Sequence, residues 1–501
     1  MKKKILSICT FLIAAITSSY AQSPNFQYSL YDYTTDYYGN VALPLMGSSG
    51  YAFLYSTNDA SDNTNSYIEW LDSQGNVIVN PVLIGVQNNT VGFALIQTAD
   101  SGFIVGGVDY NSTVTNSYAF LIKTNSSGVQ QWAKNYGQNF TSGSSIAQTK
   151  DGGYIIAGNT QSDYSFEDET NQTAIFVART DSKGNTLWSN TYGDTTLQGF
   201  ANSIHATSDG GFIITGSQLS VANNQDMYIL KLDSSGNKQW DKYYGGSYAN
   251  LGNSGMQTSD GGYIFAGGES INSGDSLAKI LVVKTDDNGN ASWSYLDTNF
   301  SSEAFSVIET KDGQFAIVGF NSVGQTDSIP QPESDAYLMK LSSAGKKLWS
   351  INPFVSQDVL FSQFSNVFQT ADGGFLMPGY GYVYDANNTP YGAAILVKTD
   401  SNGNTSTVTT GISQIISPAS NPNISVYPNP FSTQTSMNVS NTNLQNAVLL
   451  IFDMDGNIVK RIDNINSGTI TIDRVNLNSG MYFYRLMNNN GIIGTGKLVA
   501  E

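Results

Sequence analysis

Short apolar runs alternate along most of the chain with turns rich in glycine, aspartate and asparagine. Around position 209 the runs fall at Asn202–Thr207, Phe212–Ser217, Asp226–Asp233 and Asn237–Tyr244. Each contains β-branched or aromatic residues and is too short for an independent helix. The turns S-D-G-G and D-S-S-G-N join the first pair and the last pair, and their glycines permit positive φ. This pattern predicts four antiparallel strands.

The four-strand pattern repeats along the chain, with copies spaced roughly 50 to 60 residues apart, a period typical of propellers and other arrays. The aspartate of the first turn recurs at Asp100, Asp151, Asp209, Asp260, Asp312 and Asp372, with Ser48 in the first copy. The glycine of the second turn recurs at Gly75, Gly128, Gly184, Gly236, Gly289, Gly345 and Gly403. Seven copies of four strands predict an all-β chain that forms a seven-bladed β-propeller over residues 22–410.

Two segments are candidates for the strand that closes the ring. Phe26–Tyr31 is similar to the fourth strand of a repeat and precedes the first strand of the first copy. Thr405–Thr410 follows the last copy but lacks its tryptophan and aromatic ending. We expect Phe26–Tyr31 to complete the last blade beside Ala393–Asp400.

The N-terminus has the features of a secretory signal peptide. Three lysines precede an apolar stretch, Ile5–Ile16, and a small-x-small site ends at Ala21, so residues 1–21 are expected to be removed. No later run is long and apolar enough to span a bilayer. The only cysteine, Cys9, lies in the leader, so the mature chain has no disulfide. The net charge of −17 opposes binding to nucleic acid.

The two turn motifs resemble known structural devices. The T-x-D-G-G half resembles the Asp-box of sialidase-type propellers, in which the aspartate bonds to the backbone of its own hairpin turn. The D-x-x-G-x-x-x-W half resembles the tryptophan-docking motif of quinoprotein propellers. Both resemblances imply a fold and neither implies an activity.

The composition changes after residue 410. Residues 411–423 form a linker rich in proline, serine and asparagine, and a different pattern follows over 424–501. It contains Y-P-N-P at Tyr427–Pro430, the turn Asp455–Asn457, the strand Gly480–Tyr484 and the basic-apolar end Lys497–Val499. This segment resembles the type A C-terminal sorting domain of the Bacteroidota type IX secretion system. The resemblance implies a small β-sandwich that the secretion machinery recognises, and a protein that is released or attached to the cell surface. The repeats resemble uncharacterised exported propellers of the same bacteria.

Candidate catalytic and metal-binding residues are few. His205 is the only histidine, which excludes zinc sites that need several, and the matching positions in other repeats are apolar. We therefore expect His205 on a packed strand face, with no catalytic role. The turns at Asp286–Asn290 and Asp400–Asn404 carry oxygen ligands at alternate positions but lack a following bidentate glutamate, so plain turns are favoured over calcium loops. No cofactor or metal is predicted.

Two further sets of residues recur once per repeat. One set is Trp132, Trp188, Trp240, Trp293 and Trp349. The other is Lys123, Arg179, Lys231, Lys284, Lys340 and Lys398. The tryptophans could form sugar-binding platforms, but packing between blades explains a rotationally repeated position better. The cations could line a channel, but a position in the third strand favours pairing with turn carboxylates.

The loops suggest which rim binds a ligand. The first-to-second and third-to-fourth turns are short and uniform, whereas Gln161–Thr173, Ile271–Ala278, Asn321–Ser334 and Tyr382–Gly392 vary in length and composition. Variable loops on a rigid scaffold commonly carry function. The candidate ligand-binding residues are Tyr164, Phe166, Glu167, Asp168, Tyr384, Asp385 and Tyr391.

The sequence favours a secreted or surface-attached, non-enzymatic propeller that binds an extracellular glycan or protein. One alternative is a polysaccharide hydrolase or lyase, for which loops such as Ser165–Thr170 and Asp327–Asp335 would have to supply paired carboxylates. The other alternative is a structural adhesin without a concave pocket.

Overall fold

The computed structural model describes residues 25–501 except 60, 62, 86–89, 111–115, 139, 162–172, 194–197, 220–224, 271–277, 298–300, 323–333, 354, 356–358, 386–388, 406–408, 415–423, 441–443, 445–446, 453–457, 476 and 489–490. The predicted signal peptide, residues 1–21, lies outside these ranges. The described chain is all-β, and within it no segment forms a helix of the length and apolarity needed to cross a membrane.

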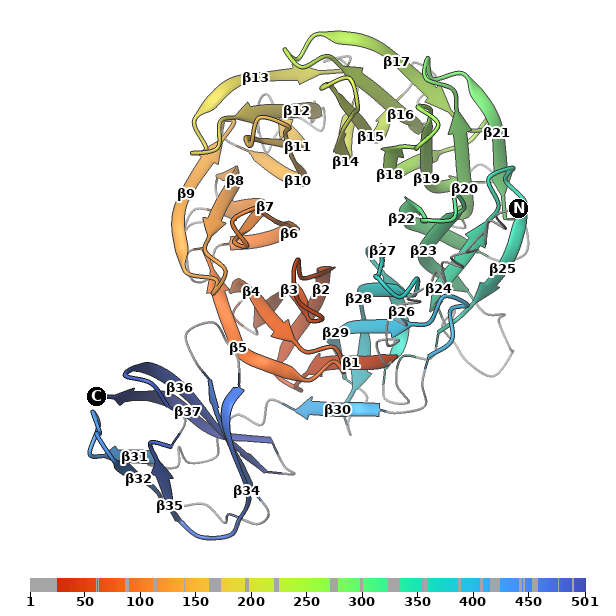
Figure 1. Cartoon of the computed structure of the whole chain (residues 1–501). Helices are drawn as coiled ribbons and strands as arrows, with labels where there is room; N and C mark the ends of the chain where they lie inside the picture. The colour runs from red at the N-terminus through yellow and green to blue at the C-terminus, as the bar shows by residue number, and fades with distance from the viewer. Residues whose placement is uncertain are drawn as a thin grey trace, which may run out of the picture.

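Seven sheets, six of them fully antiparallel, stand around a central channel as the blades of a propeller, as predicted (Figure 1). Blade 1 contains β2 (Thr35–Pro44), β3 (Tyr51–Asp59), β4 (Thr64–Leu71) and β5 (Val77–Ile84). Blade 2 contains β6 (Thr90–Gln97), β7 (Phe103–Tyr110), β8 (Ser117–Thr124) and β9 (Gln130–Tyr136). Blade 3 contains β10 (Thr141–Gln148), β11 (Tyr154–Gln161), β12 (Thr173–Thr180) and β13 (Thr186–Tyr192).

Blades 4 to 6 repeat the same order from the channel outward. Blade 4 contains β14 (Gly199–Ala206), β15 (Phe212–Leu219), β16 (Gln225–Leu232) and β17 (Lys238–Tyr244). Blade 5 contains β18 (Asn250–Gln257), β19 (Tyr263–Ser270), β20 (Ala278–Thr285) and β21 (Ala291–Leu296). Blade 6 contains β22 (Ser302–Glu309), β23 (Phe315–Ser322), β24 (Ser334–Leu341) and β25 (Lys347–Ile351).

Blade 7 closes the ring with the N-terminal strand. It contains β26 (Leu360–Phe364), β27 (Phe368–Gln369), β28 (Phe375–Tyr384), β29 (Pro390–Thr399), β1 (Phe26–Tyr31) and β30 (Thr409–Gln414). The antiparallel register of β1 on β29 pairs Phe26 with Lys398 and Leu30 with Ala394, which confirms the predicted closing strand. Strand β30 then adds in parallel to the outer edge of β1, so regular structure extends past the boundary expected at residue 410.

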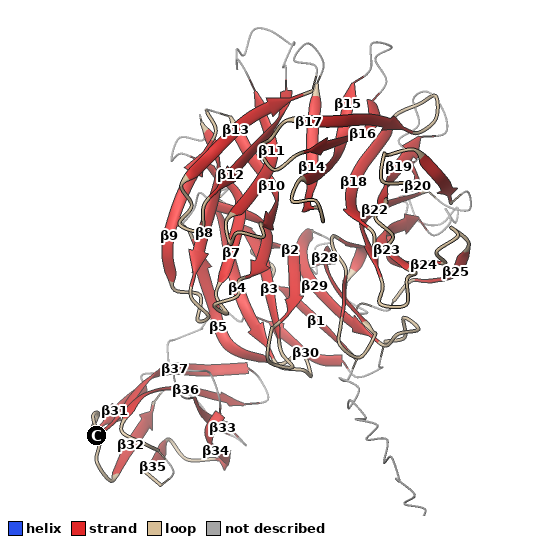
Figure 2. Cartoon of the chain, turned by 45° about the horizontal axis from the view of Figure 1, so that its top comes forward, coloured by secondary structure: helices blue, strands red, loops and turns tan. Residues whose placement is uncertain are grey.

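The C-terminal segment forms a separate two-sheet unit, as the sorting-domain resemblance implied. One sheet contains β31 (Ile424–Tyr427), β32 (Gln434–Val439) and β35 (Thr469–Asp473). The other contains β33 (Ala447–Phe452), β34 (Ile458–Ile465), β36 (Gly480–Asn488) and β37 (Gly491–Ala500). Buried residues that include Met437, Leu449 and Leu486 form a core of their own. Both views place this unit beside β5 (Figures 1 and 2).

The recurring tryptophans pack between blades, as predicted. Trp240 of β17 lies over Gly289, a positive-φ turn residue of the next blade, and its ring centre is 5.6 Å from that of Tyr263. A Cβ at position 289 would come within 3.0 Å of the indole, so the contact requires glycine. Trp132, Trp188, Trp293 and Trp349 lie over the matching glycines of their neighbours. These side chains are therefore structural.

The recurring cations pair with the aspartate of the first turn in their own blade, which confirms the predicted pairing. The pairs are Lys123–Asp100, Arg179–Asp151, Lys231–Asp209, Lys284–Asp260, Lys340–Asp312 and Lys398–Asp372. In blade 4 the two charged atoms are 2.8 Å apart. Partial burial raises the pKa of Asp209, but hydrogen bonds from Lys231, Thr207 and the Gly211 amide outweigh it and lower the pKa to about 2.

Candidate functional site

The innermost strand of each blade carries a backbone irregularity at one matching position. In blades 1 to 6 the ladder between the first two strands shifts register there, which is a β-bulge. In blade 7 the same position falls in the break between β26 and β27. The extra residues are Asn40, Phe93, Ser144, Asn202, Asn253, Phe305 and Ser365. A bulge redirects a side chain, and here each blade contributes one such residue to the channel wall.

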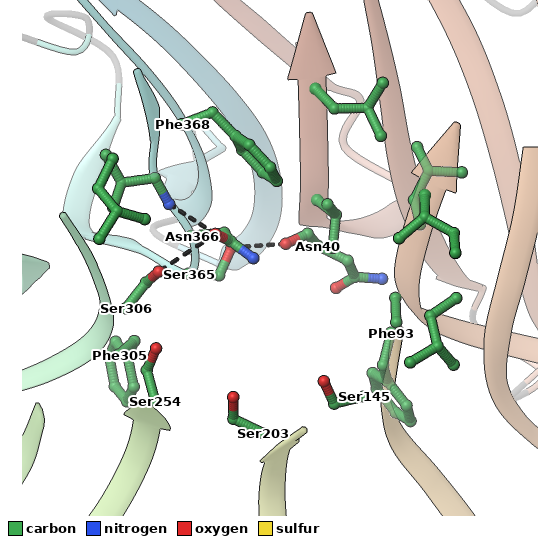
Figure 3. Close-up of a pocket in the computed structure, with 18 of the residues that line it drawn as sticks. Asn40, Phe93, Ser145, Ser203, Ser254, Phe305, Ser306, Ser365, Asn366 and Phe368 are labelled. Carbon is green, nitrogen blue, oxygen red and sulfur yellow. Dashed lines mark hydrogen bonds between the residues drawn. The ribbon is translucent and has the colours of Figure 1, made fainter. Parts of the chain in front are cut away.

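These residues and the strand segments that follow them enclose a cavity of about 570 Å³. It is lined by all seven blades (Figure 3). The lining residues Gln97 and His205 come late in their innermost strands, and Met46 lies in the turn that leads from β2 to β3. The cavity therefore lies in the half of the channel near the D-G-G rim, away from the variable loops. Its size suits a small ligand or the end of a chain.

Side-chain amides at the bulges connect neighbouring blades. The Nδ2 of Asn40 donates to the carbonyl of Gly92 over 2.7 Å, and that of Asn202 donates to Gly252 over 2.9 Å. Asn253 donates to the carbonyl of Ala304 over 2.9 Å, in the same direction around the ring. Because each bond crosses to the next blade, the amides are held in place before any ligand arrives.

Two phenylalanines supply the aromatic surface of the cavity. Phe93 is 42% exposed and Phe305 is half-buried, with its ring centre 5.9 Å from that of Phe320. Figure 3 shows Phe93 and Phe305 on opposite sides of the cavity, with serines and asparagines between them. The wall thus combines apolar ring surfaces with uncharged hydrogen-bonding groups.

His205 does not lie on a packed face, so the prediction from sequence was wrong. Its side chain is exposed and lines the cavity three residues after the bulge at Asn202. The surrounding protein desolvates the imidazole and lowers its pKa below the ordinary 6.5, so the ring is neutral at pH 7. Among the described residues that line the cavity, His205 is the only titratable one.

The predicted loop face is only partly described. Tyr164, Phe166, Glu167 and Asp168 lie outside the described residues. Tyr384 is the last residue of β28, Asp385 follows it, and Tyr391 is the second residue of β29.

The three described residues of that face make contacts within the fold. The Tyr384 ring centre is 6.5 Å from that of Phe361, and the Tyr391 ring centre is 5.9 Å from that of Tyr33. The Oδ1 of Asp385 accepts the amide of Thr389 across the turn, 2.8 Å away. Ligand binding by this hairpin stays a prediction.

The aspartate-rich turns are closed by their own side chains. The Oδ1 of Asp286 accepts the amides of Asn288 and Asn290, 3.0 and 2.8 Å away, and Asp400 does the same for Asn402 and Asn404. Among the residues that the structure describes, no group of three or more His, Cys, Asp or Glu side chains could hold a metal ion. The carboxylates of these two turns therefore have a structural role.

Sequence reasoning missed the bulge residues. A signal was nevertheless present in blades 1 to 6, because the residue before the bulge is small in each of them. It is Gly39, Gly92, Gly143, Ala201, Gly252 or Ala304 in blades 1 to 6. At Gly252 of blade 5, an added Cβ would lie 2.4 Å from the carbonyl oxygen of Gly216 in the adjacent blade 4. A small residue followed by a variable one marks the place where the backbones approach and the next side chain turns into the channel.

Comparison with known proteins identifies the C-terminal unit. Residues 425–501 match the family described as the secretion system C-terminal sorting domain. No curated protein matches the chain.

Several solved structures are similar at low identity. One is a protein of unknown function from Bacteroides caccae, 13% identical, with a TM-score of 0.35 over 60% of this chain and 90% of that one. The Pan2 WD40 domain of Neurospora crassa is 11% identical, with a TM-score of 0.43 over 72% and 88%. The β-propeller domain of the trilobed protease from Pyrococcus furiosus is 10% identical, with a TM-score of 0.41 over 74% and 96%. At these values none of them carries an argument about function.

Proposed function

Because the chain is a seven-bladed β-propeller with a type IX secretion sorting domain at its C-terminus, we propose that it is an exported, non-enzymatic binding module. Its ligand is an uncharged glycan, and its binding site is the cavity in the central channel. The observation that carries this proposal is the cavity wall, in which fixed amides and hydroxyls alternate with two phenylalanine rings.

The chemistry of the wall favours a neutral sugar over other ligands. A pyranose ring has an apolar face that packs on an aromatic ring and hydroxyls that exchange hydrogen bonds with amides and serines. The net charge of −17 opposes anionic ligands, and no described lining residue supplies a cation at pH 7. A neutral peptide segment is the alternative ligand that the same groups accommodate.

A polysaccharide hydrolase is less well supported. Such an enzyme needs two carboxyl groups on either side of the scissile bond, and the described residues that line the cavity include no carboxyl group. His205 is the one group there that can accept a proton. A reducing-sugar assay on any glycan that binds separates this alternative from simple binding.

The binding site is tested with a neutral glycan array, followed by calorimetry on the mature chain, residues 22–501. Phe93→Ala and Phe305→Ala should each weaken binding about tenfold or more, which corresponds to the loss of one aromatic contact. Phe483→Ala is the matched control, because Phe483 is 38% exposed in the sorting domain, away from the channel.

The same titrations include the predicted loop face. If Phe93→Ala binds as the wild type does and Tyr384→Ala or Tyr391→Ala loses binding, the site lies on the variable loops and the channel proposal is wrong. His205→Gln should stay within about threefold of wild type, whereas a loss of about a hundredfold would match the removal of a general base.

The sorting domain indicates export, and we propose that the secretion machinery recognises residues 424–501. Deletion of these residues should leave the propeller in the periplasm, as seen by fractionation and by protease access to whole cells. Normal surface display of the truncated chain would contradict this role. Cleavage after Ala21 is checked by N-terminal sequencing of the exported protein.

A further inference from the structure

Blade 1 has a buried glutamate where the other blades have apolar residues. Glu69 of β4 is 3% exposed. Glu69 precedes Trp70. Trp70 pairs with Val79 of the outer strand, as Lys231 pairs with Trp240 in blade 4, so Trp70 stands at the position of the recurring cation. The matching residues are Ile122, Ala178, Leu230, Val283, Met339 and Val397, all buried. A charge in a packed position requires a partner.

The outer strand of blade 1 has a β-bulge opposite this glutamate. Ile68 pairs with Val82 and Trp70 pairs with Val79, so Asn80 and Pro81 together face Glu69. The outer strands of blades 2 to 5 have no register shift at this point and shift only one residue later. Proline in a sheet is tolerated at such bulges, where no ladder bond is needed. This bulged segment of β5, residues 77–81, together with Glu69 opposite it, is called the notch of blade 1.

An arginine of the sorting domain occupies the notch. Arg485 of β36 is 3% exposed, and its guanidinium donates to the Val77 carbonyl and, over 3.2 Å, to the Oδ1 of Asn80. Its Cζ lies 5.9 Å from the ring centre of Phe452, a neighbour in the same domain. Figures 1 and 2 show the sorting domain beside β5 in both views.

Glu69 and Arg485 are also coupled through their charges. Burial raises the pKa of Glu69 to about 7, while the hydrogen bond from the Tyr28 hydroxyl, 2.7 Å long, and the charge of Arg485 act against it. Burial lowers the pKa of Arg485, and Glu69 opposes that shift. Each group therefore favours the charged state of the other in a region of low dielectric.

We propose that the notch of blade 1 is a specific docking site for the sorting domain, with Arg485 as its anchor and Glu69, when ionised, as the opposing charge. The propeller thereby holds its own export signal in one orientation. This inference does not depend on a ligand in the channel. It assigns a role to three unusual features of blade 1, namely the buried glutamate, the extra bulge and the proline.

The test measures the distance between the two units in the mature full-length chain. Because Cys9 is the only cysteine and lies in the predicted leader, Gln74→Cys and Ser467→Cys would introduce the only two thiols for spin labels. Both positions are exposed, one on blade 1 and one on the sorting domain. The wild-type background should give one narrow distance distribution.

Arg485→Gln should broaden that distribution about twofold or more, because the side-chain contacts that fix the orientation of the sorting domain on β5 are lost. Arg461→Gln is the matched control, because this arginine has the same charge, lies in the same domain and has a side chain 58% exposed. A narrow distribution in a folded Arg485→Gln protein overturns the proposal.

Hydrogen exchange on β33 and β36 shows whether Arg485→Gln unfolds the sorting domain. If it does, a second variant tests the proposal. Glu69→Gln lies in the propeller, removes only the charge and keeps an acceptor for the Tyr28 hydroxyl. In that case the distance is measured at pH 8, where Glu69 is mostly ionised; a broadened distribution in Glu69→Gln then supports the proposal, and a narrow one overturns it.

Discussion

Blade 1 and the six blades that follow it use the same positions in different ways. In blades 2 to 7 the first turn carries an aspartate that pairs with a cation of the third strand. In blade 1 both partners are replaced, by Ser48 in the turn and Trp70 in the strand. Since an unpaired buried cation is costly, loss of the aspartate is accompanied by loss of the lysine.

In the contact between blades, too, the residues that touch each other change together in blade 1. Strand β5 has Val79 at the position of the recurring tryptophan, and Gly128 of the next blade is covered by Trp70 together with Val82. At the other side of blade 1, Phe26 of the closing strand lies over Gly75. The comparison teaches that the repeat consists of coupled sets of residues, so that one set can be exchanged when all its members change.

Breaking one ion pair should have the largest effect. Lys398→Met in blade 7 would leave the carboxylate of Asp372, whose side chain is 7% exposed, without its cation. Loss of one partner of a buried pair costs about 3–5 kcal/mol. Urea unfolding should show this loss, and Lys284→Met should cost less, because its partner Asp260 has a side chain 63% exposed. Equal losses in the two variants would mean that burial does not set the strength of the pair.

The dependence of stability on pH should have opposite signs in the two kinds of blade. The folded-state pKa of Glu69 is raised from 4.5 to about 7, so its contribution is full below pH 4.5 and is lost as pH rises through about 7. The shift corresponds to roughly 3 kcal/mol. Asp100 and Asp209 have pKa values lowered to about 2, and their contribution is lost as pH falls from 3.8 through that value.

Unfolding free energies of wild type and Glu69→Gln at pH 5 and pH 8 check the sign for blade 1. The wild type should lose stability relative to the variant at the higher pH. A difference that stays constant across this range would show that Glu69 titrates normally in the folded chain.

Truncating the contact residue between blades should have an intermediate effect. Trp240→Ala removes a half-buried indole from Gly289 and Tyr263 and should cost about 2–3 kcal/mol. Val79→Ala, at the same position in blade 1, should cost about 1 kcal/mol, because fewer atoms are removed. Thermal unfolding of the two variants ranks them. The reverse order would mean that blade 1 also depends on its fourth strand for the contact.

Restoring the aspartate alone in blade 1 should have the smallest effect. An aspartate at position 48 would have no lysine partner, because Trp70 stands at the position of the recurring cation. The turn is also one residue longer, since the amide of Leu45 bonds to Gly50 whereas that of Thr98 bonds to Gly102. A change within about 0.5 kcal/mol is expected for such a surface turn. Strong stabilisation would show that the motif acts without its lysine.

The repeat, the closing strand and the sorting domain could be predicted because each leaves a local signal in the sequence. The channel wall could not, because side chains alternate between faces only while the ladder is regular. Counting alternately from the buried Ala201 places His205 on the packed face, but the bulge at Asn202 shifts the phase by one residue. Ile204 is then buried and His205 is exposed. For the same reason, alternation along the strands does not predict which other residues line the channel.

The pairing of β1 with β29 also determines the order in which the ring can be completed. Phe26 pairs with Lys398, so one of the first strands to be synthesised remains without its neighbour until almost the whole propeller has been made. Blades 1 to 6 each consist of contiguous chain and can form without a distant strand. Closing so long a loop is slow, since non-local pairing must overcome the entropy of the intervening chain. The pairing of β1 with β29 therefore keeps the ring open until the last blade has formed.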